Sequence, residues 1–449
     1  MPFASTSEQS SKLGAGYYRL LTAQVCTQLA DGVMSVAIVW LASSLTRDAR
    51  LLSLVALVTL LPWLVMSLPA GVLADRFDRR VLVASMDIGR AVVLAAFGLT
   101  IALSSDGLPA PHELASGAVS APANASLLLA LLYIGAALLG SAEVVRDNAA
   151  QTLLPAIVRA DQLEKANGRM MGAETVLNRF VGPPLAGGLI AIAIAVPFLA
   201  NAALLALAAF LAMSLRGSFR PVLRVRSGGI AWRSEIGEGF RWLWRHRLLR
   251  SLAILLGAMN LLSATAFVLL VLFVQEILGL YEGWQFGAVM TGIAVGVTLG
   301  SVLADRITAR VPTGAVLVWS IAGTVVAQGA VGLMDSGVAV WALCAAGGFA
   351  IAQWNVVTVS LRQRIIPDAL LGRVNSVYRF FGWGAMAFAP ILSGLIVTIA
   401  EPALGREWAL RLPFLITGAL GLLLVAYAAR RVTTAQITAA EQLSEPRDA

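Results

Sequence analysis

Three acidic residues, Asp31, Glu143 and Glu174, lie within long apolar stretches of the chain, where a charge is costly. A charge at the centre of a bilayer costs about 2.5–3.5 kcal/mol even on a lenient insertion scale, so each acid needs a proton, a partner or a water-filled cavity. Burial favours the uncharged form of a carboxyl group, so such acids can bind and release protons. We therefore predict proton-coupling roles for all three. The alternative is a fixed ion pair along one helix, Glu143 with Arg146 or Glu174 with Arg179; Asp31 has no basic neighbour on its own helix.

The composition places these acids in a membrane protein. Of the 449 residues, 58% are hydrophobic and 13% are charged, against roughly 25% charged residues in soluble domains. A single core stops growing near about 250–300 residues, yet apolar runs recur along the whole chain. Cys26 and Cys344 are far apart, His112 and His246 lie outside the apolar runs, and the phosphate-binding motif G-x-x-x-x-G-K-[ST] is absent. We expect an integral membrane protein that is not an enzyme and holds no metal or cofactor.

Twelve apolar segments are long enough to cross about 30 Å of hydrocarbon as helices, so the expected fold is all-α. The first six are 19–44, 51–73, 81–104, 126–147, 170–193 and 197–216, and the second six are 250–277, 284–304, 313–335, 338–360, 374–399 and 409–430. We expect five regions: a cytoplasmic tail at 1–16, a six-helix half at 17–216, a cytoplasmic linker at 217–249, a second six-helix half at 250–431 and a cytoplasmic tail at 432–449. The linker has apolar residues at helical spacing among arginines, which predicts an amphipathic helix on the inner membrane surface.

The basic residues indicate how the segments are oriented. Of the 33 Lys and Arg, 28 fall on one set of loops, including four in the region 74–90, whereas the other side has only Arg47, Arg50, Arg406 and Arg411. Positive residues near span ends are retained in the cytoplasm, so both termini are expected there. The net charge of +8 is then a topology signal, and we expect no nucleic-acid partner.

An internal repeat relates the two sets of six segments. Val72-Leu73-Ala74-Asp75-Arg76 recurs as Val302-Leu303-Ala304-Asp305-Arg306, and each copy ends the second segment of its six. A second repeated sequence pattern relates the fifth and eleventh segments, at 182–187 and 389–394. We infer a parallel duplication of a six-helix unit, with a central cavity between the halves near mid-membrane.

The stretch from Gly71 to Arg80 resembles the G-x-L-x-D-R-x-G-R-R/K signature of the major facilitator superfamily, at the expected place between segments two and three. Asp78 stands where the signature has glycine, which is similar to the branch that contains macrolide-efflux and siderophore-exporting transporters. Leu154-Pro155 and the run 166–169 also resemble that branch. The resemblance covers nearly the whole chain.

The resemblance implies a gate at the inner ends of the two halves. Asp75 and the arginines of the signature would latch these ends in the outward-open state, with Arg146 as a plausible partner of Asp75. The alternative is that the arginines only set topology. The gating candidates are Gly71, Asp75, Arg76, Arg79, Arg80, Arg146 and, in the second copy, Asp305 and Arg306.

A bend is expected in the fifth segment. Gly182, Pro183 and Gly187 resemble the antiporter motif of drug exporters, although Asn178 and Arg169 occupy positions where the full motif has glycines. Proline weakens the backbone ladder and small residues allow close helix approach. Ordinary tight packing is the alternative.

The pathway in this superfamily is lined chiefly by segments one, four, seven and ten, so the resemblance also implies cavity residues. A cavity with few acids, several amides and aromatic faces suits a bulky amphipathic solute, although amides also hold helices together. The candidates are Gln24, Gln28, Asp31, Asn178, Asn260, Gln353, Trp354, Asn355, Asn375, Tyr378, Arg379 and Trp383.

These observations favour a secondary exporter in a bacterial plasma or inner membrane. We expect proton-coupled antiport of hydrophobic or amphipathic small molecules, such as drugs or siderophore-like compounds, by alternating access. The expected partners are a small-molecule substrate, protons and the lipid bilayer, and the resemblance implies a monomer. Proton-coupled uptake and a non-transporting receptor of the same fold are the alternatives.

Overall fold

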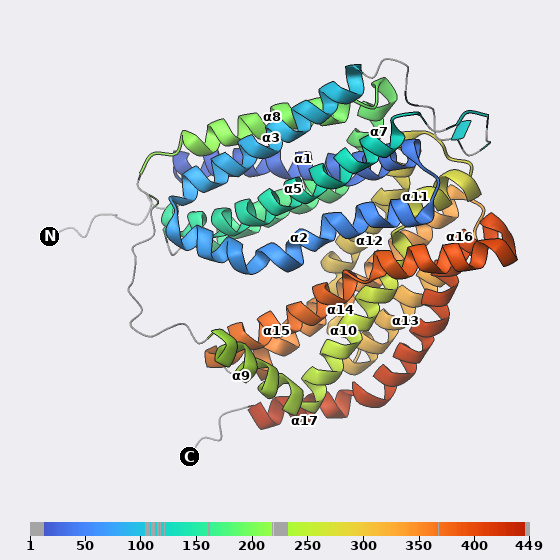
Figure 1. Ribbon diagram of the computed structural model, residues 1–449. Helices are drawn as coiled ribbons and strands as arrows, with labels where there is room; N and C mark the ends of the chain where they lie inside the picture. Colours follow the sequence, from blue (N-terminus) through green and yellow to red (C-terminus); the bar gives the residue numbers. More distant parts are fainter. Residues whose placement is uncertain are drawn as a thin grey trace. The chain divides into compact units, whose positions relative to one another are not determined.

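The computed structural model describes residues 13–103, 122–159, 162–217, 219, 232–366 and 368–444, together with positions 108, 113, 114, 116 and 118–120. Within these residues the regular secondary structure is helical (Figure 1). Eleven stretches are long and apolar enough to cross a membrane, and the last of them, Phe380–Arg431, has 52 residues, enough for two crossings. Gly405 interrupts this stretch with a φ of 77°. The chain is therefore an all-α membrane protein of twelve spans.

The first six spans occupy the N-terminal part of the chain. The fifth consists of two α-helices joined by a π-helical segment, and the others are single helices. In order they are α1 (Ala15–Leu45), α2 (Ala49–Arg76), α3 (Arg79–Leu103), α5 (Ala125–Leu153), the fifth span with α6 (Leu163–Glu174), the π segment Thr175–Val181 and α7 (Gly182–Ile192), and α8 (Val196–Met213).

The second six spans follow a linker helix, α9 (Trp232–Arg245). The helices of this half are α10 (Arg247–Phe267) with α11 (Leu270–Leu272) and the π segment Phe273–Ile277, α12 (Gly283–Thr308), α13 (Thr313–Val331), α14 (Gly337–Ile365), α15 (Asp368–Met386) and α16 (Ala389–Arg431), followed by α17 (Thr434–Ser444). The seventh span ends in the π segment. The eleventh span consists of α15 and the part of α16 before Gly405, and the twelfth is the part of α16 after Gly405.

The chain forms two compact units. Unit 1 contains Met1–Ala37, Val65–Gly107 and Ile134–Arg224, and unit 2 contains Ile38–Leu64, Leu108–Tyr133 and Val225–Ala449. The ends of α1 and α2 that flank their connecting loop therefore belong to unit 2. In unit 1, α3 packs along α8. In unit 2, α12 packs along α14, and α13 contacts both α14 and α16.

Small residues explain the closest helix contact in unit 2. Gly292, Gly296 and Gly300 are spaced four residues apart and lie on one buried face of α12. A Cβ at Gly292 would be 2.5 Å from the Trp341 carbonyl oxygen, and one at Gly300 would be 2.7 Å from the Ala352 Cβ. Lipid tails are as apolar as leucine, so helices in a bilayer associate through close packing of this kind.

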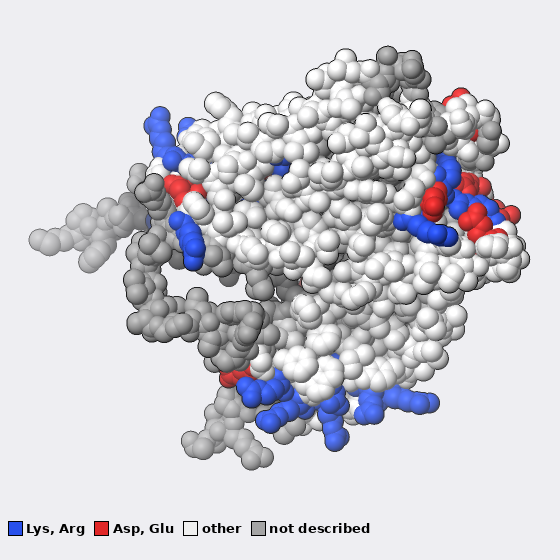
Figure 2. Space-filling model, viewed as in Figure 1, with Lys and Arg blue, Asp and Glu red and all other residues white. Residues whose placement is uncertain are grey.

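Large apolar side chains cover much of the outer surface. Leu103, Ile192 and Val338 are more than 70% exposed, and Figure 2 shows broad uncharged areas with the charged side chains gathered at their edges. Such a surface would favour aggregation of a soluble protein. In a multi-pass membrane protein these side chains contact lipid.

Candidate functional site

Two of the three acids singled out in the sequence share one arginine inside unit 1. Arg90 on α3 contacts the Asp31 carboxylate on α1 through its Nη2, and the same nitrogen is 4.0 Å from Glu143 Oε2 on α5. The side chains of Arg90, Asp31 and Glu143 are 3%, 8% and 29% exposed. A single guanidinium group thus faces two carboxyl groups, and Glu143 is the more accessible of the two.

A second buried arginine, Arg146 on α5, has a similar arrangement. Its Nε is 3.6 Å from Asp87 Oδ1 and its Nη1 is 3.1 Å from Asp147 Oδ1. Nη1 also donates to Gln24 Oε1 at 2.6 Å, and Nη2 donates to Thr27 Oγ1 at 3.0 Å. Arg146 and Asp87 are fully buried. Arg146 therefore joins three helices, α1, α3 and α5.

We call Asp31, Asp87, Arg90, Glu143, Arg146 and Asp147 the acidic cluster. With every group ionised it would have four negative and two positive charges. Neither carboxylate oxygen of Asp87 has a hydrogen-bond partner among the described residues. A net negative charge in a low-dielectric interior is costly unless it is paired or neutralised. The arrangement therefore favours uptake of protons by the cluster.

The amides predicted on α1 border this cluster. Gln24, Gln28 and Asp31 are four and three residues apart, so they share one helix face. Gln24 accepts a hydrogen bond from Arg146. Gln28 Oε1 accepts one from Asn178 Nδ2 at 3.1 Å, which connects α1 to the π segment of span five. Four of the predicted cavity residues are thus brought together in unit 1.

The third predicted acid, Glu174, lies apart from these pairs. It is exposed at the end of α6. Among the described ion pairs there is none between Glu174 and Arg179, and none between Glu143 and Arg146. The fixed pairs along one helix are therefore not formed.

The predicted cavity residues of unit 2 occupy different environments. Asn260 Nδ2 donates to the Gly382 carbonyl at 3.1 Å. Gln353 is buried, and its Nε2 donates to the Gly300 carbonyl at 2.6 Å. The other placements are as follows: Trp354 and Tyr378 are in the apolar core, Asn355 is exposed, and the side chains of Asn375, Arg379 and Trp383 lie outside the described ones.

Gly182 of the predicted bend lies directly against Gly32 on α1. A Cβ at Gly182 would be 2.5 Å from Gly32 Cα, and a Cβ at Gly32 would be 2.6 Å from the Asn178 carbonyl oxygen. Pro183 and Gly187 are buried on the same helix, α7, which begins where the π segment ends. The motif therefore positions span five against α1, one residue from Asp31.

Substituting Gly182 with alanine is expected to lower the free energy of unfolding by about 1–3 kcal/mol, the usual cost of overpacking. The added methyl group would meet the backbone of Gly32, which cannot move aside as a side chain could. Gly188→Ala is the matched control, because a Cβ at Gly188 meets nothing within 4 Å. Thermal unfolding of the detergent-solubilised protein measures both effects, and equal melting temperatures for the two variants would contradict the assignment.

The arginines of the signature bind helix ends within unit 1. Arg79 Nη1 donates to the Thr152 carbonyl at 2.9 Å, and Arg80 Nη1 donates to the Leu215 carbonyl at 2.8 Å. These carbonyls lie at or just beyond the C-terminal ends of α5 and α8, where the helix dipole favours cations. Asp78 begins α3, because its Oδ1 accepts from the Arg80 amide at 3.0 Å, an N-cap contact that glycine could not make.

The remaining gating candidates have few described contacts. Arg76 is exposed, and so are Asp305 and Arg306 at the end of α12. The Asp75 side chain and Gly71 lie outside the described side chains. The pairing of Arg146 with Asp75 therefore stays a prediction; the described partners of Arg146 are those of the acidic cluster.

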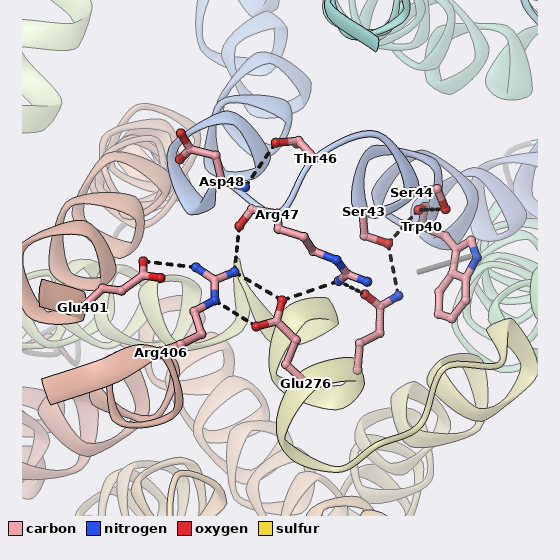
Figure 3. Close-up of polar contacts among 10 residues, drawn as sticks. Trp40, Ser43, Ser44, Thr46, Arg47, Asp48, Glu276, Glu401 and Arg406 are labelled. Carbon is pink, nitrogen blue, oxygen red and sulfur yellow. Dashed lines mark hydrogen bonds and ion pairs between the residues drawn. The ribbon is translucent and has the colours of Figure 1, made fainter. Parts of the chain in front are cut away.

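A second polar cluster surrounds the loop between α1 and α2 in unit 2 (Figure 3). Arg47 Nη1 donates to Gln275 Oε1 at 2.5 Å and is 3.5 Å from Glu276 Oε1. Arg406 binds Glu276 Oε2 at 2.8 Å and Glu401 Oε2 at 3.2 Å, and its Nη2 donates to the Arg47 carbonyl at 2.7 Å. Burial lowers the pKa of Arg47, and the nearby Glu276 carboxylate opposes that shift. We call these five residues the loop cluster.

Local backbone irregularities make the loop cluster possible. Gln275 and Glu276 are consecutive, and the π segment Phe273–Ile277 widens the helical turn so that both reach Arg47. π-Helical turns of this kind are frequent at functional sites. Gly405, with a φ of 77°, turns the chain immediately before Arg406. The α1–α2 loop is thereby tied to the seventh span and to the start of the twelfth.

Comparison with known proteins identifies the family. A model of the Major Facilitator Superfamily matches residues 20–390 of the chain. The chain belongs to this superfamily. It is therefore a multi-pass membrane transporter of twelve helices in two six-helix halves, and not an enzyme.

Two named exporters are similar in sequence to this chain. The multidrug efflux pump Tap of Mycobacterium tuberculosis is 30% identical over 415 residues, which cover 89% of this chain and 91% of Tap. The enterobactin exporter EntS of Escherichia coli is 27% identical over 209 residues, which cover 45% of this chain and 48% of EntS. The resemblance to the drug and siderophore exporter branch is thus confirmed.

Solved structures confirm the superfamily fold. A bacterial homolog of the human lysosomal transporter Spinster superposes with a TM-score of 0.65 at 14% identity, covering 95% of this chain and 93% of that one. The nucleoside transporter NupG gives a TM-score of 0.62 at 13% identity, covering 92% of this chain and 98% of that one.

Three members of the acidic cluster in this transporter are not among the residues predicted from the sequence: Asp87, Arg90 and Asp147. The sequence pattern does not mark Asp87 as an intramembrane acid, and it groups Arg90 with the cytoplasmic cations of the region 74–90. The structure corrects both, because each is at most 3% exposed within α3. Asp31 also has a basic partner after all, on a different helix. The signal was available: Val83, Asp87 and Arg90 recur at helical spacing on the buried face of α3.

Proposed function

We propose that this transporter is a proton-coupled antiporter that exports hydrophobic or amphipathic small molecules across a bacterial inner membrane. The observation that carries the proposal is the sharing of Arg90 by Asp31 and Glu143 inside unit 1. Efflux is supported by the names of the two relatives, a multidrug pump and an enterobactin exporter. The cation count supports cytoplasmic termini.

The acidic cluster supplies a physical route from protonation to movement. Glu143 is the more accessible of the two acids on Arg90, so it exchanges protons with the pathway, and Arg90 then pairs with Asp31 alone. When Glu143 loses its proton, Arg90 is again divided between two carboxylates. Asp31 is adjacent to Gly32, which packs on Gly182. A change in the Asp31 pair is therefore transmitted to span five.

Transport in proteoliposomes tests this function directly. A panel of lipophilic cations, a catechol siderophore and a fluorescent lipid would be followed with and without an imposed pH gradient. The proposal expects that at least one compound moves against its gradient when protons flow the other way. Transport that is indifferent to the pH gradient would overturn proton coupling, and substrate moving in the same direction as protons would indicate uptake instead.

We further propose that the loop cluster closes the side of the membrane opposite the termini. Arg47 and Arg406 are two of only four basic residues assigned to that side, and their contacts connect the α1–α2 loop with span seven and the start of span twelve. Charge-assisted bonds of this kind are stronger than neutral ones when they are partly buried. Separation of these partners would open that side of the pathway.

Substituting Arg406 with glutamine is expected to increase access to Ser43, which is fully buried behind Gln275. In a Ser43→Cys variant with both natural cysteines replaced, reaction with a membrane-impermeant thiol reagent should be about tenfold faster, the equivalent of about 1.4 kcal/mol. Arg310→Gln is the matched control, because Arg310 is an exposed arginine outside the loop cluster. Unchanged reaction rates in Arg406→Gln would show that the loop cluster does not restrict access.

A further inference from the structure

A cavity of about 210 Å³ lies inside unit 2, away from both polar clusters. It is lined by four helices, α10, α12, α13 and α14, which contribute side chains that are nearly all apolar, and it is open on one side. Phe267, Ile293 and Val331 are typical of the lining. The cavity therefore offers an apolar environment within a single unit of the transporter.

Two polar side chains, Ser263 and Gln328, line this otherwise apolar space. Gln328 lines the cavity, is 4% exposed, and accepts a hydrogen bond from Ser263 Oγ at its Oε1 at 3.0 Å. Its Nε2 has no hydrogen-bond partner among the described residues. An amide donor that faces apolar side chains without a partner is unfavourable. An acceptor placed in the cavity would remove that cost.

The dimensions of the cavity limit its occupant. Pockets for drug-sized molecules measure about 300–1,000 Å³, whereas an apolar cavity of about 150 Å³ binds benzene. The space next to Gln328 is between these limits. A glycine, Gly347, forms part of the wall, and a Cβ there would meet only the Ala327 Cβ at 3.6 Å, so no side chain fills this region.

We propose that this cavity is a binding site for a small neutral aromatic molecule that has one hydrogen-bond acceptor, with the ring among the apolar side chains and the acceptor on Gln328 Nε2. Aromatic ketones and esters have this chemistry. The proposal is independent of the direction and coupling of transport, because every lining residue belongs to unit 2.

The test uses 4-fluoroacetophenone and its isostere 4-fluoro-α-methylstyrene, in which a methylene replaces the ketone oxygen. Fluorine NMR of the purified protein in detergent should show a bound resonance for the ketone that saturates with concentration. Gln328→Leu should weaken ketone binding about two- to tenfold, the equivalent of one hydrogen bond, and alter alkene binding less than twofold. Equal effects on the two probes would overturn the role of Gln328.

Filling the cavity provides the second measurement. Gly347→Leu should abolish the bound resonance of both probes, whereas Ala346→Leu should preserve it, because Ala346 is exposed on the same helix and is not part of the lining. The melting temperature reports whether each variant folds. If Gly347→Leu fails to fold, Cys344→Phe replaces it, because Cys344 lines the cavity from the adjacent turn. A bound resonance that persists in a folded, filled variant would place the ligand elsewhere and overturn the proposal.

Discussion

Replacing Arg146 with leucine is expected to lower the free energy of unfolding by about 3–5 kcal/mol, the cost of breaking one side of a buried ion pair. Arg146 is fully buried and is the cation for Asp87 and Asp147. Its loss would leave the fully buried carboxyl group of Asp87 without this cation, and would remove the hydrogen bonds to Gln24 and Thr27. Thermal unfolding in detergent and the membrane abundance of the variant measure the effect.

A second substitution separates the charge from the packing. Adding Asp87→Leu to Arg146→Leu should restore much of the lost stability, because the buried carboxylate is removed with its partner. Arg76→Leu is the control for loss of an arginine, since Arg76 is exposed. If the double variant were less stable than Arg146→Leu alone, Asp87 could not be the uncompensated group.

The second large effect is expected on coupling rather than on stability. Substitution of Glu143 with glutamine should reduce transport driven by a pH gradient at least tenfold, while exchange of substrate for substrate continues. The reason is that Arg90 would keep Asp31 as its only carboxylate partner at every pH, so the exchangeable proton site is lost and the substrate pathway remains. Asp31→Asn should impair both activities, because it removes the carboxylate that Arg90 contacts directly.

Proteoliposome transport in the two modes distinguishes these outcomes. Glu282→Gln is the matched control, since Glu282 is an exposed carboxylate that caps α12 and a glutamine retains the acceptor oxygen. A Glu143→Gln variant that still concentrates substrate in response to a pH gradient would show that the proton binds elsewhere.

The spans and part of the acidic cluster could be predicted from the sequence, because helical spacing and the energetic cost of charges in lipid both leave a pattern in it. The twelve spans follow from hydropathy, because lipid imposes both a minimum length and internal hydrogen bonding. Asp31 and Glu143 stand out because acids are rare in apolar runs. The face formed by Gln24, Gln28 and Asp31 follows from helical spacing.

Other features depend on contacts that a single sequence does not contain. Arg90 is close in sequence to the signature arginines, so it is counted with the cytoplasmic cations. Its burial in α3, which only the structure shows, distinguishes it from them. The loop cluster joins Arg47 to residues more than 200 positions away. Its formation depends on a π-helical turn and on the positive φ of Gly405. Neither irregularity produces a repeating pattern of apolar residues by which it could be predicted.

Proton release on substrate binding shows directly whether substrate and proton compete for one site in the transporter. The purified transporter, in weakly buffered detergent solution with a pH indicator, would receive a compound that the proteoliposome panel has identified as a substrate. We expect a net release of protons from the unsubstituted protein and none from Glu143→Gln, because substrate and proton compete through the Arg90 site. Substrate binding without proton release, or equal release from both proteins, would contradict it.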